Sequence, residues 1–202
     1  MTKVLIATLY KAEPVLLFLT RIGSERVILL IDEKPNDEQL NNLKLIKESI
    51  GKVVDVKEVK CSTYDIVKVA EKAVEIIDMQ PRDDKIYINI TSGRKTKAIG
   101  LLFAAYARNE RISKIAYNPE EDKNAIVYLP KLSFKLNESQ KKILEYLDKE
   151  DFQKLSFADM AEKIGISRAM FYKSIEELKD MDFIYSTEEG IFLTDAGKIA
   201  RL

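Results

Sequence analysis

Short apolar runs alternate with longer amphipathic stretches along the first two thirds of the chain. The runs have the form of buried strands, and the apolar residues between them recur at helical spacing. Strands that alternate with helices of this length predict an α/β domain with a Rossmann-like, doubly wound and mainly parallel sheet. We expect strands at residues 4–7, 27–31, 53–59, 85–90, 112–117 and 125–129, the last two as an antiparallel hairpin at the sheet edge.

Helix-stop and helix-start residues support the helices between these strands. Gly23 follows a helical pattern at residues 15–22, where a glycine commonly closes a helix. Ser62 and Asp65 have the spacing of a capping box, so we expect the third helix to begin directly after Ser62. A fourth, apolar helix follows the polar segment 91–96.

From residue 131 the pattern changes to short helices and a hairpin. A helix, a helix-turn-helix, a hairpin and a last helix, in this order, are typical of a winged helix-turn-helix. We therefore predict two domains: a Rossmann-like α/β domain at residues 1–130 and a winged helix-turn-helix domain at residues 131–202. The expected helix N-caps are Asn137, Ser156, Ser167 and Thr194, and the expected hairpin strands are residues 183–185 and 191–193.

The composition excludes several kinds of enzyme. The chain contains no histidine, so no imidazole can act as a base or bind a metal, and a Ser-His-Asp triad is impossible. With only one cysteine besides, we expect no zinc site and no disulfide, while carboxylate-bound magnesium stays open. The lone Cys61 fits a cytoplasmic protein, and no apolar run is long enough to span a membrane.

The most distinctive polar segment is residues 91–96, between an expected strand and an apolar helix. Hydroxyls and backbone N–H groups at a helix N-terminus favour an anion, and Gly93 lets a phosphate come close. Arg94, Lys95 and Lys97 add positive charge. Phosphate-loop spacing and the dinucleotide glycine fingerprint are both missing, which disfavours an ordinary nucleotide hydrolase or an NAD enzyme. The alternative is a capped turn with solvated lysines.

A second candidate follows the first strand and comprises Thr8, Leu9, Tyr10 and Lys11. In open α/β sheets, ligands bind at the carboxyl ends of strands, where the strand order reverses. The first and fourth strands commonly flank that point, so we expect Thr8 to meet the segment 91–95. For Tyr10 and Lys11, an ordinary exposed loop is the alternative.

The third candidate is the helix after Ser167, the recognition helix of the expected winged domain. Its inward stripe is expected at Phe171, Ile175 and Leu178, which leaves the opposite side to face a DNA groove. Acidic residues on the same helix, and a slight acidic excess in residues 131–202, favour dimerisation or packing instead. The candidates for DNA contact are Ser167, Arg168, Tyr172 and Lys173.

The two halves together resemble the CARF family, the CRISPR-associated Rossmann-fold sensors, in the subgroup of archaeal CRISPR-associated transcription regulators with a C-terminal winged helix-turn-helix. Thr8-Leu9-Tyr10 lies where the family has one ligand loop, and the stretch from Ile191 to Gly197 resembles the wing-to-helix segment of winged-helix regulators. The similarity to the family's strand-4 signature is carried by Asn89-Ile90-Thr91-Ser92-Gly93-Arg94-Lys95-Thr96-Lys97.

This resemblance implies a homodimer that binds a cyclic oligoadenylate across its two-fold axis, without metal or resident cofactor. Relatives with a HEPN ribonuclease domain need an Arg…His motif, which a chain without histidine cannot supply, so that activity is excluded. By position, the implied ligand-binding residues are Thr8, Leu9, Tyr10, Thr91, Ser92, Gly93, Arg94, Lys95 and Thr96.

Three functions fit the sequence. In the first, cyclic oligoadenylate biases a dimer that binds double-stranded DNA through paired winged helices and regulates transcription. In the second, the first domain is a metal-independent ring nuclease: a 2′-hydroxyl of the ligand attacks the phosphate, Lys95 stabilises the charge and Thr8 orients the ribose. In the third, the winged helix contacts only another protein. We expect the first, and whether the chain is also an enzyme stays open.

Overall fold

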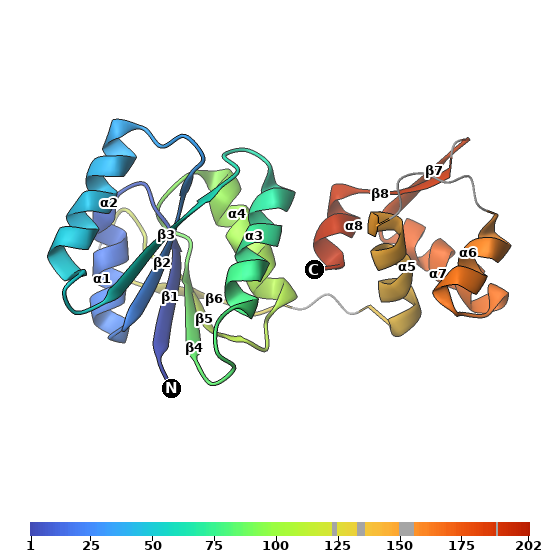
Figure 1. The fold of residues 1–202 in the computed structure, drawn as a ribbon, viewed down its shortest axis with the longest axis horizontal. Helices are drawn as coiled ribbons and strands as arrows, with labels where there is room; N and C mark the ends of the chain where they lie inside the picture. The colour runs from blue at the N-terminus through green and yellow to red at the C-terminus, as the bar shows by residue number, and fades with distance from the viewer. Residues whose placement is uncertain (123–124, 133–135, 150–155, 189) are drawn as a thin grey trace. The chain divides into compact units, whose positions relative to one another are not determined.

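The structure is a computed structural model that describes residues 1–122, 125–132, 136–149, 156–188 and 190–202. The chain divides into two compact units, residues 1–133 and 134–202 (Figure 1). Each unit has a hydrophobic core of its own. No helix within the described residues is both long enough and apolar enough to cross a membrane.

The first unit is built around a six-stranded sheet of order β3-β2-β1-β4-β5-β6. Strands β1 to β5 are parallel and β6 pairs antiparallel with β5, which confirms the doubly wound sheet and its edge hairpin. Helices α1 and α2 cover one face, and α3 and α4 cover the other (Figure 1). The elements are β1 (Lys3–Thr8), α1 (Ala12–Ile22), β2 (Arg26–Asp32), α2 (Asp37–Ile50), β3 (Asp55–Cys61), α3 (Ile66–Asp78), β4 (Lys85–Asn89), α4 (Lys95–Ala107), β5 (Ile112–Tyr117) and β6 (Val127–Leu129).

Both faces of the central strands are buried, which explains why these strands are apolar runs without alternation. On β1, Leu5 and Ala7 belong to one core cluster together with Phe18 of α1. On the other face, α3 and α4 approach closely at Gly100. A Cβ atom there would lie 2.6 Å from Cγ1 of Val69, so only glycine permits this helix contact.

The start of α3 differs from the prediction. The N-cap is Asp65, whose side chain accepts a hydrogen bond from the N–H of Lys68 at 3.0 Å. Ser62 instead accepts from the N–H of Asp65 at 3.2 Å and fixes the turn before the helix. Both residue types can cap, but a carboxylate also interacts favourably with the helix dipole, so the helix begins at Ile66.

The second unit is a winged helix-turn-helix, as predicted. Asn137 and Gln140 form a reciprocal capping box, in which each backbone N–H donates to the other side chain at 2.9 Å. Gly165 adopts the left-handed conformation in the turn between the two helices of the helix-turn-helix. The elements are α5 (Glu138–Lys149), α6 (Phe157–Ile164), α7 (Arg168–Asp180), β7 (Ile184–Thr187), β8 (Gly190–Leu193) and α8 (Asp195–Ala200).

Candidate ligand-binding site

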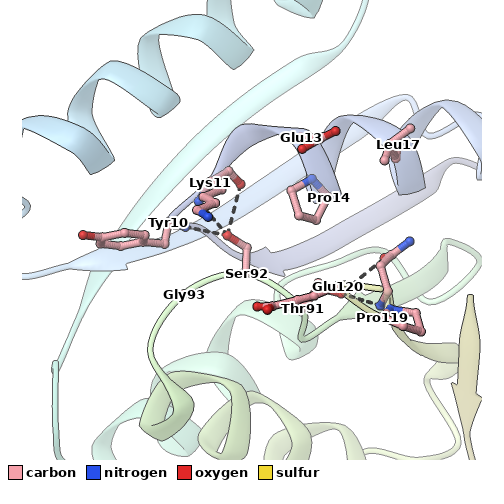
Figure 2. A pocket seen from close by; sticks show the side chains of 11 residues that line it. Tyr10, Lys11, Glu13, Pro14, Leu17, Thr91, Ser92, Gly93, Pro119 and Glu120 are labelled. Atoms are coloured by element: carbon pink, nitrogen blue, oxygen red, sulfur yellow. Dashed lines mark hydrogen bonds between the residues drawn. The ribbon is translucent and has the colours of Figure 1, made fainter. Parts of the chain in front are cut away.

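A pocket of about 330 Å³ lies at the carboxyl ends of β1, β4 and β5 (Figure 2). Strand β1 lies between β2 and β4, so the order of the strands reverses at this point. Open α/β sheets bind their ligands at such a switch point, and the volume suits a small molecule or one unit of a larger one. The lining residues are Tyr10, Lys11, Glu13, Pro14, Leu17, Thr91, Ser92, Gly93, Asn118, Pro119 and Glu120.

Ser92 joins the two loops that the sequence singles out. Its Oγ accepts hydrogen bonds from the backbone N–H groups of Tyr10 at 2.8 Å and Lys11 at 2.7 Å (Figure 2). The same hydroxyl donates to the carbonyl oxygen of Lys11 at 3.0 Å. The hydroxyl of Thr8 donates to the carbonyl oxygen of Ser92. The structure therefore brings Thr8 and the segment 91–95 together.

Two buried asparagines shape the same loop. The sequence analysis included Asn89 in the strand-4 signature without a role in the site, and it missed Asn118. Asn89, the last residue of β4, donates from Nδ2 to Oδ1 of Asn118 at 2.9 Å and accepts from the N–H of Thr91 at 3.0 Å. The hydroxyl of Thr91 accepts from the N–H of Asn118 at 2.8 Å. The available signal was Asn89 itself, because a polar residue within a buried strand needs hydrogen-bond partners.

Gly93 is required by the backbone of the loop. Its φ of +97° lies in a region that residues with a side chain rarely adopt. A Cβ atom on Gly93 would also lie 3.1 Å from Cβ of Thr8, which is tighter than ordinary packing. Gly93 therefore lets the loop cross directly over the end of β1, in addition to lining the pocket.

The basic residues of the segment divide into two kinds. Arg94 and Lys95 are exposed, whereas Lys97 is fully buried and its ammonium group pairs with Asp32 at the end of β2. The expectation that Lys97 adds charge for a ligand is therefore wrong, because a buried carboxylate already takes its charge. Arg94 donates from Nε to Asp32 at 3.1 Å. This hydrogen bond raises the pKa of the Arg94 guanidinium, which stays charged.

The N-terminus of α4 has no side-chain cap. Its N-cap is Arg94, which makes no capping hydrogen bond, and the first turn carries no acidic residue. The positive end of the helix dipole is therefore available to an anion, with Lys95 exposed beside it. The hydroxyl of Thr96 donates to the carbonyl oxygen of Thr63 at 2.7 Å, so it ties the start of α4 to the loop before α3.

The first-strand loop contributes mainly through its backbone. Thr8 and Leu9 are fully buried, and Leu9 belongs to the core cluster, so neither side chain lines the pocket. Tyr10 does line it, and its hydroxyl donates to Glu38 at 2.9 Å. Thr8 thus acts on the site through Ser92. Within the described residues, no group of three or more metal-ligand side chains could hold a metal ion.

Helix α7 presents the residues proposed for DNA contact on its outer side. Its inward residues Phe171, Ile175 and Leu178 are buried, as expected. Ser167 also caps the helix by accepting from the N–H of Met170 at 3.3 Å. The four candidates Ser167, Arg168, Tyr172 and Lys173 are exposed.

Family models match both units. The model described as HFX_2341_N:-like, N-terminal, matches residues 5–122, and the model described as winged helix-turn-helix DNA-binding matches residues 136–185. No curated protein sequence matches the chain.

Solved structures share the fold at low sequence identity. Can2 from Sulfobacillus thermosulfidooxidans, in complex with cyclic tetra-adenylate, has a TM-score of 0.52 at 14% identity, over 98% of this chain and 63% of its own. Csm6 from Enterococcus italicus, bound to cyclic hexa-2′-fluoro-hexa-dAMP, has a TM-score of 0.52 at 14% identity, over 90% and 53%. Protein VC1899 from Vibrio cholerae has a TM-score of 0.52 at 9% identity, over 98% and 63%. The chain spans less than two thirds of each of these proteins.

Fold and site together define the class of protein: a Rossmann-like domain with a pocket at its strand switch point, followed by a winged helix-turn-helix. Can2 and Csm6 are CARF-domain proteins, so the resemblance to the CARF family is confirmed at the level of the fold. The chain belongs to the HFX_2341_N-like family, whose N-terminal model covers more than half of it.

Proposed function

We propose that the protein is a transcription regulator that binds cyclic oligoadenylate through its first unit and double-stranded DNA through its second. The observation that carries this proposal is the pocket at the switch point beside the uncapped N-terminus of α4. Backbone N–H groups and the exposed Lys95 favour a phosphate there. Can2, which shares the fold, was solved with cyclic tetra-adenylate, and the second unit matches a DNA-binding model. The free, buried Cys61 fits action in the cytoplasm.

In this proposal the regulator acts as a homodimer. A two-fold dimer offers the same two loops twice to a ring of repeating nucleotides, and two recognition helices to a pair of DNA half-sites. The ligand regulates by binding one arrangement of the dimer more tightly than the other. Sedimentation equilibrium with and without cyclic tetra-adenylate tests the dimer, and a monomer under both conditions would contradict it.

Lys95→Ala is expected to weaken the binding of cyclic tetra-adenylate by about 10- to 100-fold, because a charge-assisted contact to phosphate is lost. The measurement is isothermal titration calorimetry in EDTA. The matched control is Lys44→Ala, which removes an exposed lysine from α2, where it forms an ion pair with Glu48 on the same helix. Equal affinities for wild type and the Lys95 variant would rule out a ligand contact by Lys95.

Chromatography of the ligand recovered from the same titration tests the ring nuclease. Recovery of the intact ring supports the regulator. Linear products ending in a 2′,3′-cyclic phosphate would instead identify a metal-independent ring nuclease, and the Lys95 variant should then lose turnover as well as affinity.

Arg168→Ala is expected to weaken binding to the DNA upstream of the protein's own coding sequence by at least about fivefold, because Arg168 lies exposed at the N-terminal end of the recognition helix. Gel shifts at low and high salt provide the measurement, since phosphate contacts weaken steeply with salt. Lys179→Ala, an exposed lysine at the opposite end of α7, is the control. If wild type binds no DNA even at low salt, the winged helix serves a protein contact.

A further inference from the structure

The buried carboxylate of Asp32 forms ion pairs with two basic side chains. Its side chain is 5% exposed, and it pairs with Lys97 through one oxygen and with Arg94 through the other. Its backbone N–H donates to Oε1 of the buried Gln39 at 3.1 Å, so α2 holds the strand end as well. This cluster lies at the end of β2, and neither Asp32 nor Arg94 belongs to the lining of the pocket over β1, β4 and β5.

The two cations differ in exposure, and this difference determines their roles. The Lys97 side chain is 0% exposed, so no ligand reaches it, and it serves as the permanent counter-ion of Asp32. The Arg94 side chain is 41% exposed. Because one carboxylate cannot neutralise two cations, the surplus positive charge resides on the group that solvent reaches, which is Arg94.

Asp32 accepts a hydrogen bond from only one nitrogen of the Arg94 guanidinium. Only Nε bonds to the carboxylate, and within the described residues the two terminal amino groups make no hydrogen bond. The guanidinium lies over the ring of Tyr64, with 5.4 Å between Cζ and the ring centroid. A guanidinium held at Nε and against an aromatic face has lost most of its freedom before any ligand arrives.

We propose that Asp32 is a positioning residue, which with Tyr64 holds Arg94 as a pre-oriented, bidentate ligand for a phosphate. The phosphate belongs to a second subsite over β2 and β3, beside the pocket, so that a ligand with several phosphates spans both. This inference rests on the proposed function, in which a cyclic oligoadenylate supplies those phosphates. Pre-orientation raises affinity because the ordering of the side chain is complete before binding.

Three variants test the proposal by titration with cyclic tetra-adenylate. Arg94→Ala removes the ligand group and should weaken binding by about 10- to 100-fold. Tyr64→Leu changes an exposed side chain, leaves folding intact, and should weaken binding by about two- to tenfold through lost orientation. Asp32→Leu combined with Lys97→Met removes both buried charges together and should weaken binding by a similar factor.

A double-mutant cycle separates positioning from a general structural effect. If Asp32 and Tyr64 act through Arg94, their variants should cause no further loss of affinity in a protein that already carries Arg94→Ala. The same loss with and without Arg94 would overturn the proposal. Because Tyr64→Leu leaves the buried cluster untouched, the cycle remains decisive if the Asp32 and Lys97 variant fails to fold.

A measurement that does not use cyclic oligoadenylate distinguishes failure of this inference from failure of the proposed function. Binding of no cyclic oligoadenylate by wild type would reject the proposed ligand. The subsite is then tested with inorganic phosphate while the NMR signals of the Arg94 guanidinium are followed. Slow rotation about the Nε–Cζ bond of Arg94 in the absence of phosphate, with a change in the chemical shifts of the guanidinium when phosphate is added, supports the subsite. Free rotation, or no shift, would overturn it.

Discussion

Asp32→Asn is expected to lower the free energy of unfolding of the first unit by about 3–5 kcal/mol, the typical cost of leaving one partner of a buried ion pair without the other. Lys97 is 0% exposed, so its ammonium cannot reach water once the carboxylate is gone. Arg94 cannot replace the carboxylate as the partner of Lys97, because both side chains are positively charged. Hydrogen exchange of the β1 and β2 amides in the full chain measures this change.

The controls isolate the buried charge as the cause. Arg94→Ala removes the exposed partner and should cost less than about 1 kcal/mol, because solvent screens Arg94 and Lys97 continues to neutralise Asp32. Asp32→Leu combined with Lys97→Met should recover most of the stability, since well-packed apolar residues can replace a buried ion pair. An Asp32→Asn variant as stable as wild type would show that Lys97 finds another partner or water.

Phe171→Ala is expected to destabilise the second unit by about 3–5 kcal/mol, which is comparable with the whole stability of so small a unit. Phe171 is 1% exposed within the winged-helix core, and 5.7 Å separate the centroid of its ring from that of Phe157. Truncation leaves a cavity between α6 and α7 and displaces the recognition helix. We expect loss of DNA binding together with loss of exchange protection in helices α5 to α8.

Two comparisons make this second prediction specific. Lys173→Ala, two residues further along the same helix, removes an exposed side chain and should leave the free energy of unfolding unchanged within about 0.5 kcal/mol. The amides of β1 in the first unit should keep their protection in the Phe171 variant, because the two units have separate cores. A variant that keeps its protection in α7 would show that the core closes over the cavity.

Local signals predicted the elements well because caps and periodicity act within a few residues. Gly23 does close α1 in the left-handed conformation, and Asn137 does cap α5. The error at Ser62 has the same origin, since Asp65 competes for the same role three residues later and becomes the cap. The two possible N-caps are three residues apart, within one turn of helix, and the sequence pattern allows the helix to begin after either of them.

The site was predicted less completely than the fold. The convergence of Thr8 and Ser92 followed from general rules for open sheets, and the structure contains it. The roles of individual side chains did not follow, because Leu9 lies in the core and Thr8 acts through a carbonyl oxygen. Asn118, which bonds to the loop from beyond β5, is separated from Thr91 by 27 residues and gave no local signal.

The sequence by itself determined the two-part organisation, the order of strands and helices, and the polar character of the loop at residues 91–96, because hydrophobic periodicity and capping are local properties. Only the tertiary structure decided which charges of that loop are available. Lys97 and Arg94 are three residues apart in a basic run, yet one is buried and the other exposed. That difference depends on Asp32, which reaches them from β2 across 62 and 65 residues of chain, and on the packing that excludes water from one partner alone.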